Sequence, residues 1–126
     1  MSAQVVYDFN PNFGLDRSFS PKAGTAAATV AADQGTACSW LNQTSGDTFE
    51  VAVARPAAAS LASLKAKAAA GTPASGLGDA AYFSKSGLVG RVDVFTGAYW
   101  LVATSVYFGT ANDAKNLVTA ALGALR

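Results

Sequence analysis

The sequence predicts an α+β fold, with about five or six strands in a curved antiparallel sheet and two main helices packed on it. Three features lead to this prediction. Short segments with period-two alternation are separated by turn formers, two longer segments carry apolar residues at helical spacing, and the order is strands, helix, strand meander, helix. A chain of 126 residues has room for one domain with one apolar core.

The N-terminal residues predict an edge strand followed by a loop. Val5, Tyr7 and Phe9 recur at every second position, as in a strand, and Asn10-Pro11-Asn12 interrupts the pattern. The residues that come next lack a regular period and predict a loop. We therefore divide the chain into an N-terminal strand and loop segment, residues 1–24, and a single α+β domain, residues 25–126.

The next segments predict a short helix and two strands. The alanines of Thr25–Ala32 favour a short helix. Ala37–Leu41 and Thr48–Ala54 alternate as strands do, and the residues between them are turn formers. The pair is expected to be antiparallel, with one face of the second strand in the core.

A longer helix is expected after these strands. Pro56 ends the second strand and suits the first helical position, where its missing N–H costs nothing. Leu61, Leu64 and Ala68 have helical spacing, and Gly71 is a typical residue to follow a helix end. Since this apolar stripe is shallow, we expect the helix to lie close against the sheet.

The second half of the chain predicts an antiparallel meander. Residues 72–79 read as a loop, and glycine-containing turns separate three expected strands, Ala80–Ser84, Gly90–Thr96 and Ala98–Phe108. The last of these carries large apolar groups on both faces, so we expect it to be covered on both sides.

The closing helix has the clearest pattern. Thr110 is the expected N-cap, and Asp113 stands where a capping box places its acidic residue. The apolar face contains Leu117, Val118, Ala121, Leu122 and Leu125.

Composition argues against several function classes. Nine basic and eight acidic residues leave a formal charge of +1, too weak a positive field for a nucleic-acid partner. The chain has no His and one Cys, so it lacks the commonest general base and most zinc ligand sets. No apolar run reaches the roughly 18 residues of a membrane span. We expect no catalytic, cofactor-binding or metal-binding residues and no cofactor.

The carboxylates Glu50, Asp79 and Asp93 are the first candidates for acid–base chemistry, but no spacing pairs them at catalytic separation. We expect each to face solvent or to cap a turn. Arg91 and Asp93 lie two residues apart in one strand, which predicts a surface ion pair worth less than about 1 kcal/mol.

Cys38 is expected to be a small buried hydrophobe; pairing with a cysteine outside this chain is the alternative. Aromatic residues of the predicted strands are either core or the lining of a ligand or partner surface. The candidates for such a surface are Trp40, Tyr82, Phe83, Phe95 and Trp100.

Two stretches carry a resemblance to a family. Ala37-Cys38-Ser39-Trp40 and Gly76-Leu77-Gly78-Asp79-Ala80-Ala81-Tyr82-Phe83 resemble the Cys-x-Trp and Gly-x-Gly-Asp-x-Ala-Tyr pattern of actinobacterial cell-envelope lipoproteins of the DUF3558 type. The resemblance covers residues 36–125. It implies an exported α+β domain similar to the Mog1/PsbP-like sandwich and implies no catalytic residues. The lipobox and early cysteine of that family have no counterpart here, and we expect the native leader or anchor to lie outside the given residues.

From these features we expect a non-enzymatic, extracytoplasmic (secreted or envelope-anchored) domain that binds a protein or a small apolar ligand at the cell envelope. One alternative is a structural or assembly subunit that forms a homo-oligomer, because a surface of low charge is easily desolvated. Another is a cytoplasmic small-ligand-binding domain.

Overall fold

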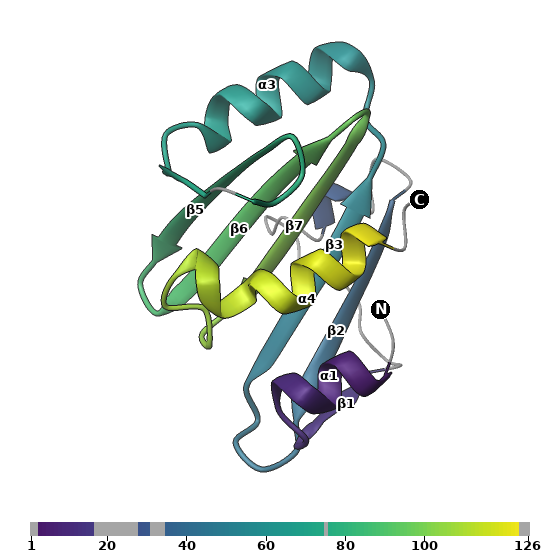
Figure 1. The fold of residues 1–126 in the computed structure, drawn as a ribbon, viewed down its shortest axis with the longest axis vertical. Coiled ribbons are helices and arrows are strands. Elements are labelled where there is room, and N and C mark those ends of the chain that lie inside the picture. The colour runs from purple at the N-terminus through teal and green to yellow at the C-terminus, as the bar shows by residue number, and fades with distance from the viewer. Residues whose placement is uncertain (1–2, 17–27, 31–34, 75, 124–126) are drawn as a thin grey trace.

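An antiparallel sheet of seven strands forms the centre of the fold in the computed structural model, which describes residues 3–16, 28–30, 35–74 and 76–123 (Figure 1). In spatial order the strands are β1 (Phe13–Leu15), β2 (Thr36–Asn42), β3 (Thr48–Ala54), β7 (Tyr99–Ser105), β6 (Val89–Thr96), β5 (Ala80–Ser86) and β4 (Thr72–Pro73). The main helices are α1 (Ala3–Phe9), α3 (Ala58–Ala68) and α4 (Ala111–Gly123). The expected α+β class is confirmed.

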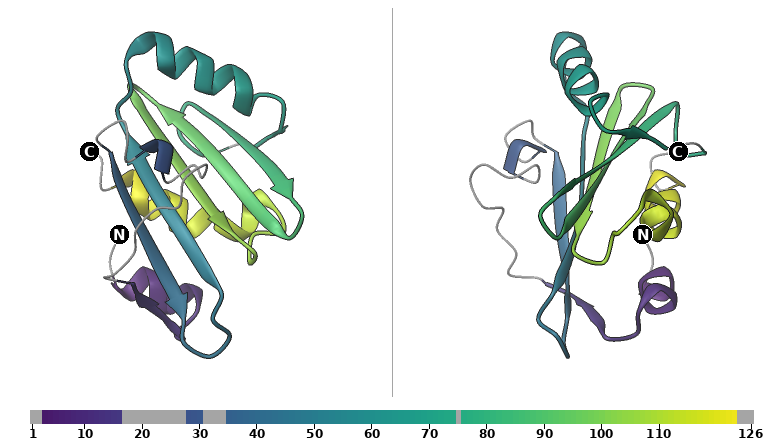
Figure 2. Two further views of the ribbon diagram at one scale, coloured as in Figure 1. Left: turned by 180° about the vertical axis from the view of Figure 1, so that it is seen from behind. Right: turned by 90° about the vertical axis from the view of Figure 1, so that its left-hand side faces the viewer.

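Helices cover both faces of the sheet. Figure 2 shows α1 and α4 on one side, and α3 with the helical turn at residues 28–30 on the other. After β3 the chain forms α3, then strands β4, β5 and β6, and then β7, which pairs with β3. As a result β7 lies inside the sheet, as expected, and both its faces are covered from Trp100 to Ala103, whereas Thr104 is only half-buried.

The larger core lies between the sheet and the helices α1 and α4. Phe49 and Leu101 contribute from the central strands, and Leu117 contributes from α4; all three are fully buried. Phe9 and Phe13 pack edge-on or tilted against this core near Phe49. Each fully buried side chain of this size stabilises the fold by roughly 1.5–3 kcal/mol.

A smaller core lies under α3. Trp100 and Phe95 are its largest buried members, and Leu61, Leu64 and Ala68 of α3 pack against it. The predicted apolar stripe of this helix is therefore the face that contacts the sheet. No residue of α3 is fully buried, as expected for a shallow stripe on a helix that lies at one end of the sheet.

The strand predicted over Val5–Phe9 is wrong, because these residues belong to helix α1. Val6 and Phe9 are three positions apart and both pack on the larger core, which a helix permits and a strand does not. The side chain of Gln4 also donates a hydrogen bond to Asp8, one helical turn away (2.8 Å). A short apolar run fits either period, and packing decided between them.

The predicted N-terminal loop contains strand β1, which pairs with the end of β2. Phe13 is buried in the core, so residues 3–16 share the sheet and core of the rest of the chain. The loop expected over residues 72–79 likewise contains β4, whose two residues pair with Tyr82 and Phe83. These two edge strands bring the sheet to seven strands. Of the helix expected over Thr25–Ala32, the structure describes residues 28–30, which are helical.

The remaining elements follow the predictions closely. The strands after the 72–79 segment form the expected antiparallel meander, with turns at Gly87 and Gly97. Helix α3 ends before Gly71 as expected, but Pro56 does not occupy its first helical position: the helix begins at Ala58 with Ala57 as the N-cap residue, so Pro56 precedes the cap. At the start of α4, the Asp113 carboxylate accepts hydrogen bonds from the backbone N–H groups of Gly109 and Thr110 (2.9 and 3.0 Å).

Candidate functional site

A row of polar residues crosses the α3 side of the sheet. Strand register places five residues directly opposite one another on neighbouring strands. From β2 to β5 this polar row contains Ser39, Glu50, Thr104, Arg91 and Ser84. Residues paired across a sheet point to the same face, and α3 packs over the other end of that face, around Trp100.

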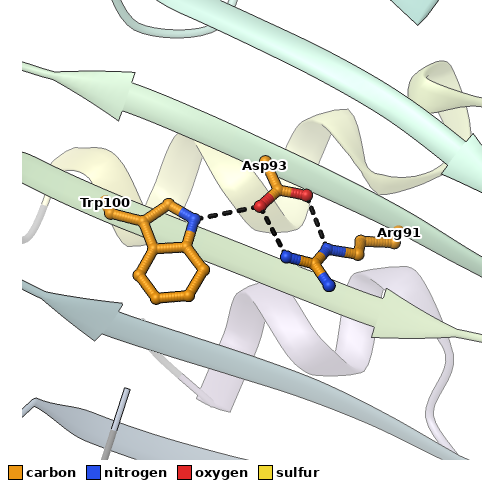
Figure 3. A network of polar contacts seen from close by, with 3 residues as sticks. All are labelled: Arg91, Asp93 and Trp100. Carbon is orange, nitrogen blue, oxygen red and sulfur yellow. Dashed lines mark hydrogen bonds and ion pairs between the residues drawn. The ribbon is translucent and has the colours of Figure 1, made fainter. Parts of the chain in front are cut away.

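At the border between the polar row and the core under α3 lies a buried ionic network. Asp93 is only 4% exposed, and its carboxylate accepts three hydrogen bonds. Arg91 donates two of them, from Nε to Oδ1 (2.6 Å) and from Nη2 to Oδ2 (2.9 Å), and Trp100 Nε1 donates the third to Oδ2 (3.0 Å) (Figure 3). The network fixes the orientation of the guanidinium plane.

The three donors compensate for the burial of the carboxylate. A buried charge without partners costs several kcal/mol, whereas charge-assisted hydrogen bonds are about twice as strong as neutral ones. The hydrogen bond to Asp93 raises the pKa of Arg91 above its ordinary value, although desolvation opposes this change. Arg91 is therefore cationic at every physiological pH, and 39% of its side-chain surface remains exposed.

This arrangement corrects the expectation that Asp93 faces solvent and forms a surface ion pair. Strand β6 lies between β5 and β7, and α3 packs on the same face, so little of the carboxylate is left exposed to solvent. Asp79 does act as a capping group, because it accepts a hydrogen bond from the backbone N–H of Gly97 (2.8 Å). Glu50 is half-buried in the polar row.

Two pockets adjoin the polar row. The first, with a volume of about 320 Å³, lies beside the C-terminal end of α3; we call it the Arg91 pocket. Its lining consists of Leu64, Lys67, Ala68, Ala70, Gly71, Ser84, Arg91 and Asp93. The second, of about 190 Å³, includes Glu50 and Thr104 of the row together with the apolar Val89 and Val106. The row thus connects two concave regions of one face.

The aromatic residues predicted as a candidate surface divide between the two faces. Trp40 and Phe83 pack against the larger core, where Trp40 stacks on Phe49 at a centroid distance of 4.8 Å. Phe95 and Trp100 are buried in the core under α3, and the half-buried Tyr82 packs against it. The sheet therefore separates these five residues into two groups.

Cys38, which was expected to be buried, is only half-buried in β2, because it lies opposite Val51 of β3 near the border of the face that the larger core occupies. Among the described residues, no group of three or more His, Cys, Asp and Glu side chains lies close enough together to hold a metal ion. What the described side chains do offer is hydrogen-bonding and charged groups held on rigid strands, which is suited to binding.

The sequence identifies both members of the Arg91–Asp93 ion pair but did not predict the buried network around Asp93. The position of the β6–β7 turn is the feature of the sequence that could have indicated the contact between Asp93 and Trp100. With Gly97 and Ala98 as the turn, Asp93 lies opposite Val102, and Trp100 becomes its diagonal neighbour on the same face. Lys67 lines the same pocket as Arg91 because of the way α3 lies on the sheet, and no spacing in the sequence indicates that these two residues share a pocket.

A scan against family models and searches of curated proteins and of solved structures found no match to this chain. Across the described part of the chain, every helix is too short or too polar to cross a membrane.

Proposed function

We propose that this chain is a non-enzymatic, extracytoplasmic binding domain of a cell-envelope lipoprotein, and that it binds through the polar row and the two pockets beside it. One observation carries the proposal. The α3 side of the sheet presents an oriented, half-exposed arginine in the lining of one of two neighbouring concave regions, backed by the central strands. Ligand sites typically combine a concave surface with a few fixed polar groups.

The chemistry of this face fits a partner with both polar and apolar parts. Arg91, Thr104 and Ser84 supply hydrogen-bonding groups, whereas Val89 and Val106 add half-exposed apolar area at the far end. Interfaces commonly place apolar contacts beside directional polar ones. A protein segment or a small ligand with an apolar part can use both kinds of contact.

The location at the cell envelope is supported by the resemblance to DUF3558-type lipoproteins, carried by Ala37–Trp40 and Gly76–Phe83. In the structure the first stretch lies in β2 and the second leads into β5. Both stretches therefore contribute residues to the sheet that presents the proposed binding face. Only 13% of the residues are charged, which agrees with a surface that a partner can desolvate easily.

Site-specific photo-crosslinking in cells that carry the natural gene tests this proposal. A photoreactive amino acid replaces Thr104, at the centre of the polar row, or, as the matched control, the exposed Asn116 on helix α4 of the opposite side. We expect one discrete crosslinked species from position 104 in the envelope fraction and none from position 116. Equal crosslinking from both positions, none from position 104, or a chain confined to the cytoplasmic fraction contradicts the proposal.

A specific observation also favours the second candidate, a homo-oligomeric assembly subunit. Leu88 is 78% exposed, and Val89 and Val106 beside it are about 40% exposed, so apolar side chains gather at one end of the sheet. Light scattering after size exclusion measures the mass of the purified chain directly. A dimer that Leu88→Ser converts to a monomer supports assembly, and a monomer at all micromolar concentrations contradicts it.

A further inference from the structure

We infer that the Arg91 pocket binds a carboxylate that carries a short apolar chain, with the guanidinium of Arg91 holding the carboxylate. This inference rests on the proposed binding function and names the ligand class for one of its two pockets. It is carried by the orientation of Arg91, by the charges that line the pocket, and by the apolar side chains of α3 beside them.

Arg91 is oriented for a second partner. A guanidinium has five N–H donors, and Asp93 accepts from two of them, on Nε and Nη2. The other three, including both on Nη1, have no hydrogen-bond partner among the described residues. Figure 3 shows Nη1 on the side of the guanidinium away from Asp93. The edge formed by Nη1 and Nη2 has the parallel donor geometry that matches the two oxygens of a carboxylate.

Asp93 and Trp100 act as positioning residues in this arrangement. The buried carboxylate holds the guanidinium at two points, and the indole N–H of Trp100 holds the carboxylate. Little side-chain freedom remains for a ligand to remove, which lowers the entropic cost of binding.

The charges that line the pocket favour one negative group. Arg91 and Lys67 contribute two positive charges and Asp93 one negative charge, so the lining has a net charge of +1. A single carboxylate neutralises it. The C-terminal end of α3 carries a partial negative charge that disfavours an anion nearby. The positive charge of Lys67, in the last turn of this helix, offsets that effect.

The apolar part of the ligand is assigned to the side of the pocket formed by α3. Leu64 and Ala68 line the pocket and pack on the core beneath it, so an alkyl chain beside them replaces water on apolar surface. The volume of about 320 Å³ lies at the lower end of the range for ligand pockets. A chain of a few carbon atoms fits this space better than a large ring system.

The two tryptophans allow a direct test by nuclear magnetic resonance. The indole N–H of Trp100 donates to Asp93, whereas Trp40 lies on the opposite face and serves as an internal reference. We titrate the full chain with hexanoate, with the neutral hexanamide and with inorganic phosphate. We expect hexanoate to shift the Trp100 indole signal with a saturating curve and a dissociation constant in the millimolar range, and to leave the Trp40 signal in place.

Matched lysine variants separate a specific contact from general charge. Lys65 and Lys67 both lie in the last turn of α3 and are exposed, but only Lys67 lines the pocket. Lys67→Gln is expected to weaken hexanoate binding about two- to five-fold, and Lys65→Gln to leave it unchanged. Arg91→Lys keeps a charge beside Asp93 but loses the parallel donors, and is expected to weaken binding about ten-fold or more.

Several results overturn the inference: no saturable shift with hexanoate, equal shifts with hexanamide, tighter binding of phosphate than of hexanoate, or equal effects of the two lysine variants. The inference is also overturned if a folded Arg91→Lys variant binds hexanoate as tightly as the parent protein. If hexanoate does not bind but position 104 still gives a crosslink, the proposed binding function stands and the proposed ligand class is wrong. If the carboxylate binds while position 104 gives no crosslink, the inference holds and the proposed partner surface is wrong.

Discussion

The substitution Trp100→Phe tests the buried network most directly. Trp100 is 1% exposed and donates its indole N–H to Asp93 Oδ2, so phenylalanine removes one charge-assisted hydrogen bond and leaves a small void. Loss of such a bond costs about 1.5–3 kcal/mol, and the lost ring contacts add up to about 1 kcal/mol. We expect the free energy of unfolding to fall by about 2–4 kcal/mol. Trp100→Ala adds a larger cavity and is expected to cost roughly 3–5 kcal/mol for the lost packing alone.

Urea denaturation followed by circular dichroism measures this change, since a domain of this size normally unfolds in one cooperative step. The midpoint of thermal unfolding is expected to fall by roughly 8–16 °C. The matched control is Trp40→Phe. Trp40 is half-buried and stacks on Phe49, and phenylalanine preserves the stacking, so we expect a loss below about 1 kcal/mol.

A double-mutant cycle then assigns the effect to the hydrogen bond. Asp93→Asn combined with Trp100→Phe is expected to show a coupling energy of at least about 1 kcal/mol, because the two side chains are in direct contact. A Trp100→Phe variant as stable as the parent protein refutes the reasoning. So does a Trp40→Phe variant that loses more stability than Trp100→Phe, or a cycle with no coupling.

Three further substitutions test local features of the fold by the same denaturation assay. A Cβ at Gly90 would overlap the backbone carbonyl of Phe108, so Gly90→Ala is expected to cost at least about 2 kcal/mol; a neutral effect contradicts this close approach. Gly123 is the last residue of α4, and no atom of the described residues would contact a Cβ there, so Gly123→Ala is expected to add about 0.5–1 kcal/mol, and a loss of stability would show that this position requires glycine. Asp113 accepts hydrogen bonds from two backbone N–H groups before α4, so Asp113→Ala is expected to cost about 1 kcal/mol; no change would show that water replaces this cap at no cost.

The central strands were predictable because both their faces and their turns have local signatures. Thr48–Ala54 alternates two sets of side chains, and the observed β3 has those bounds. Gly87 and Gly97 adopt positive φ angles in the turns of the meander, a conformation that glycine tolerates best. The apolar face of α4 was also predictable, since Leu117 and Val118 repeat at helical spacing with Ala121 and Leu122; Leu125, the fifth predicted member, lies outside the described residues.

The N-terminal segment was not predictable, because Val5–Phe9 is too short for its period to decide between helix and strand. Packing of Val6 and Phe9 on the larger core decides in favour of the helix. The edge strands β1 and β4 have three and two residues, too few for a pattern of their own. They pair because a longer neighbouring strand supplies the hydrogen-bonding partners.

The candidate site likewise combines features that the sequence predicts with features that only tertiary packing sets. Arg91 and Asp93 were identifiable as a pair from their positions in one strand, but their burial was not. The pockets beside them depend on residues far apart in the chain, since Lys67 lies on α3 and Ser84 on β5. The register that aligns Glu50 with Thr104 depends on β7 returning beside β3 across the intervening elements.

By itself, the sequence determined the α+β class, the central strands, the meander and the apolar face of the last helix, because alternation, helical spacing and turn residues act within a few positions. Only the tertiary structure decided that Asp93 is a buried acceptor and that Arg91 borders a pocket. Whether a polar side chain on a strand is exposed depends on what covers that strand. Here the cover is α3, which packs over one end of a face assembled from strands distant in the chain.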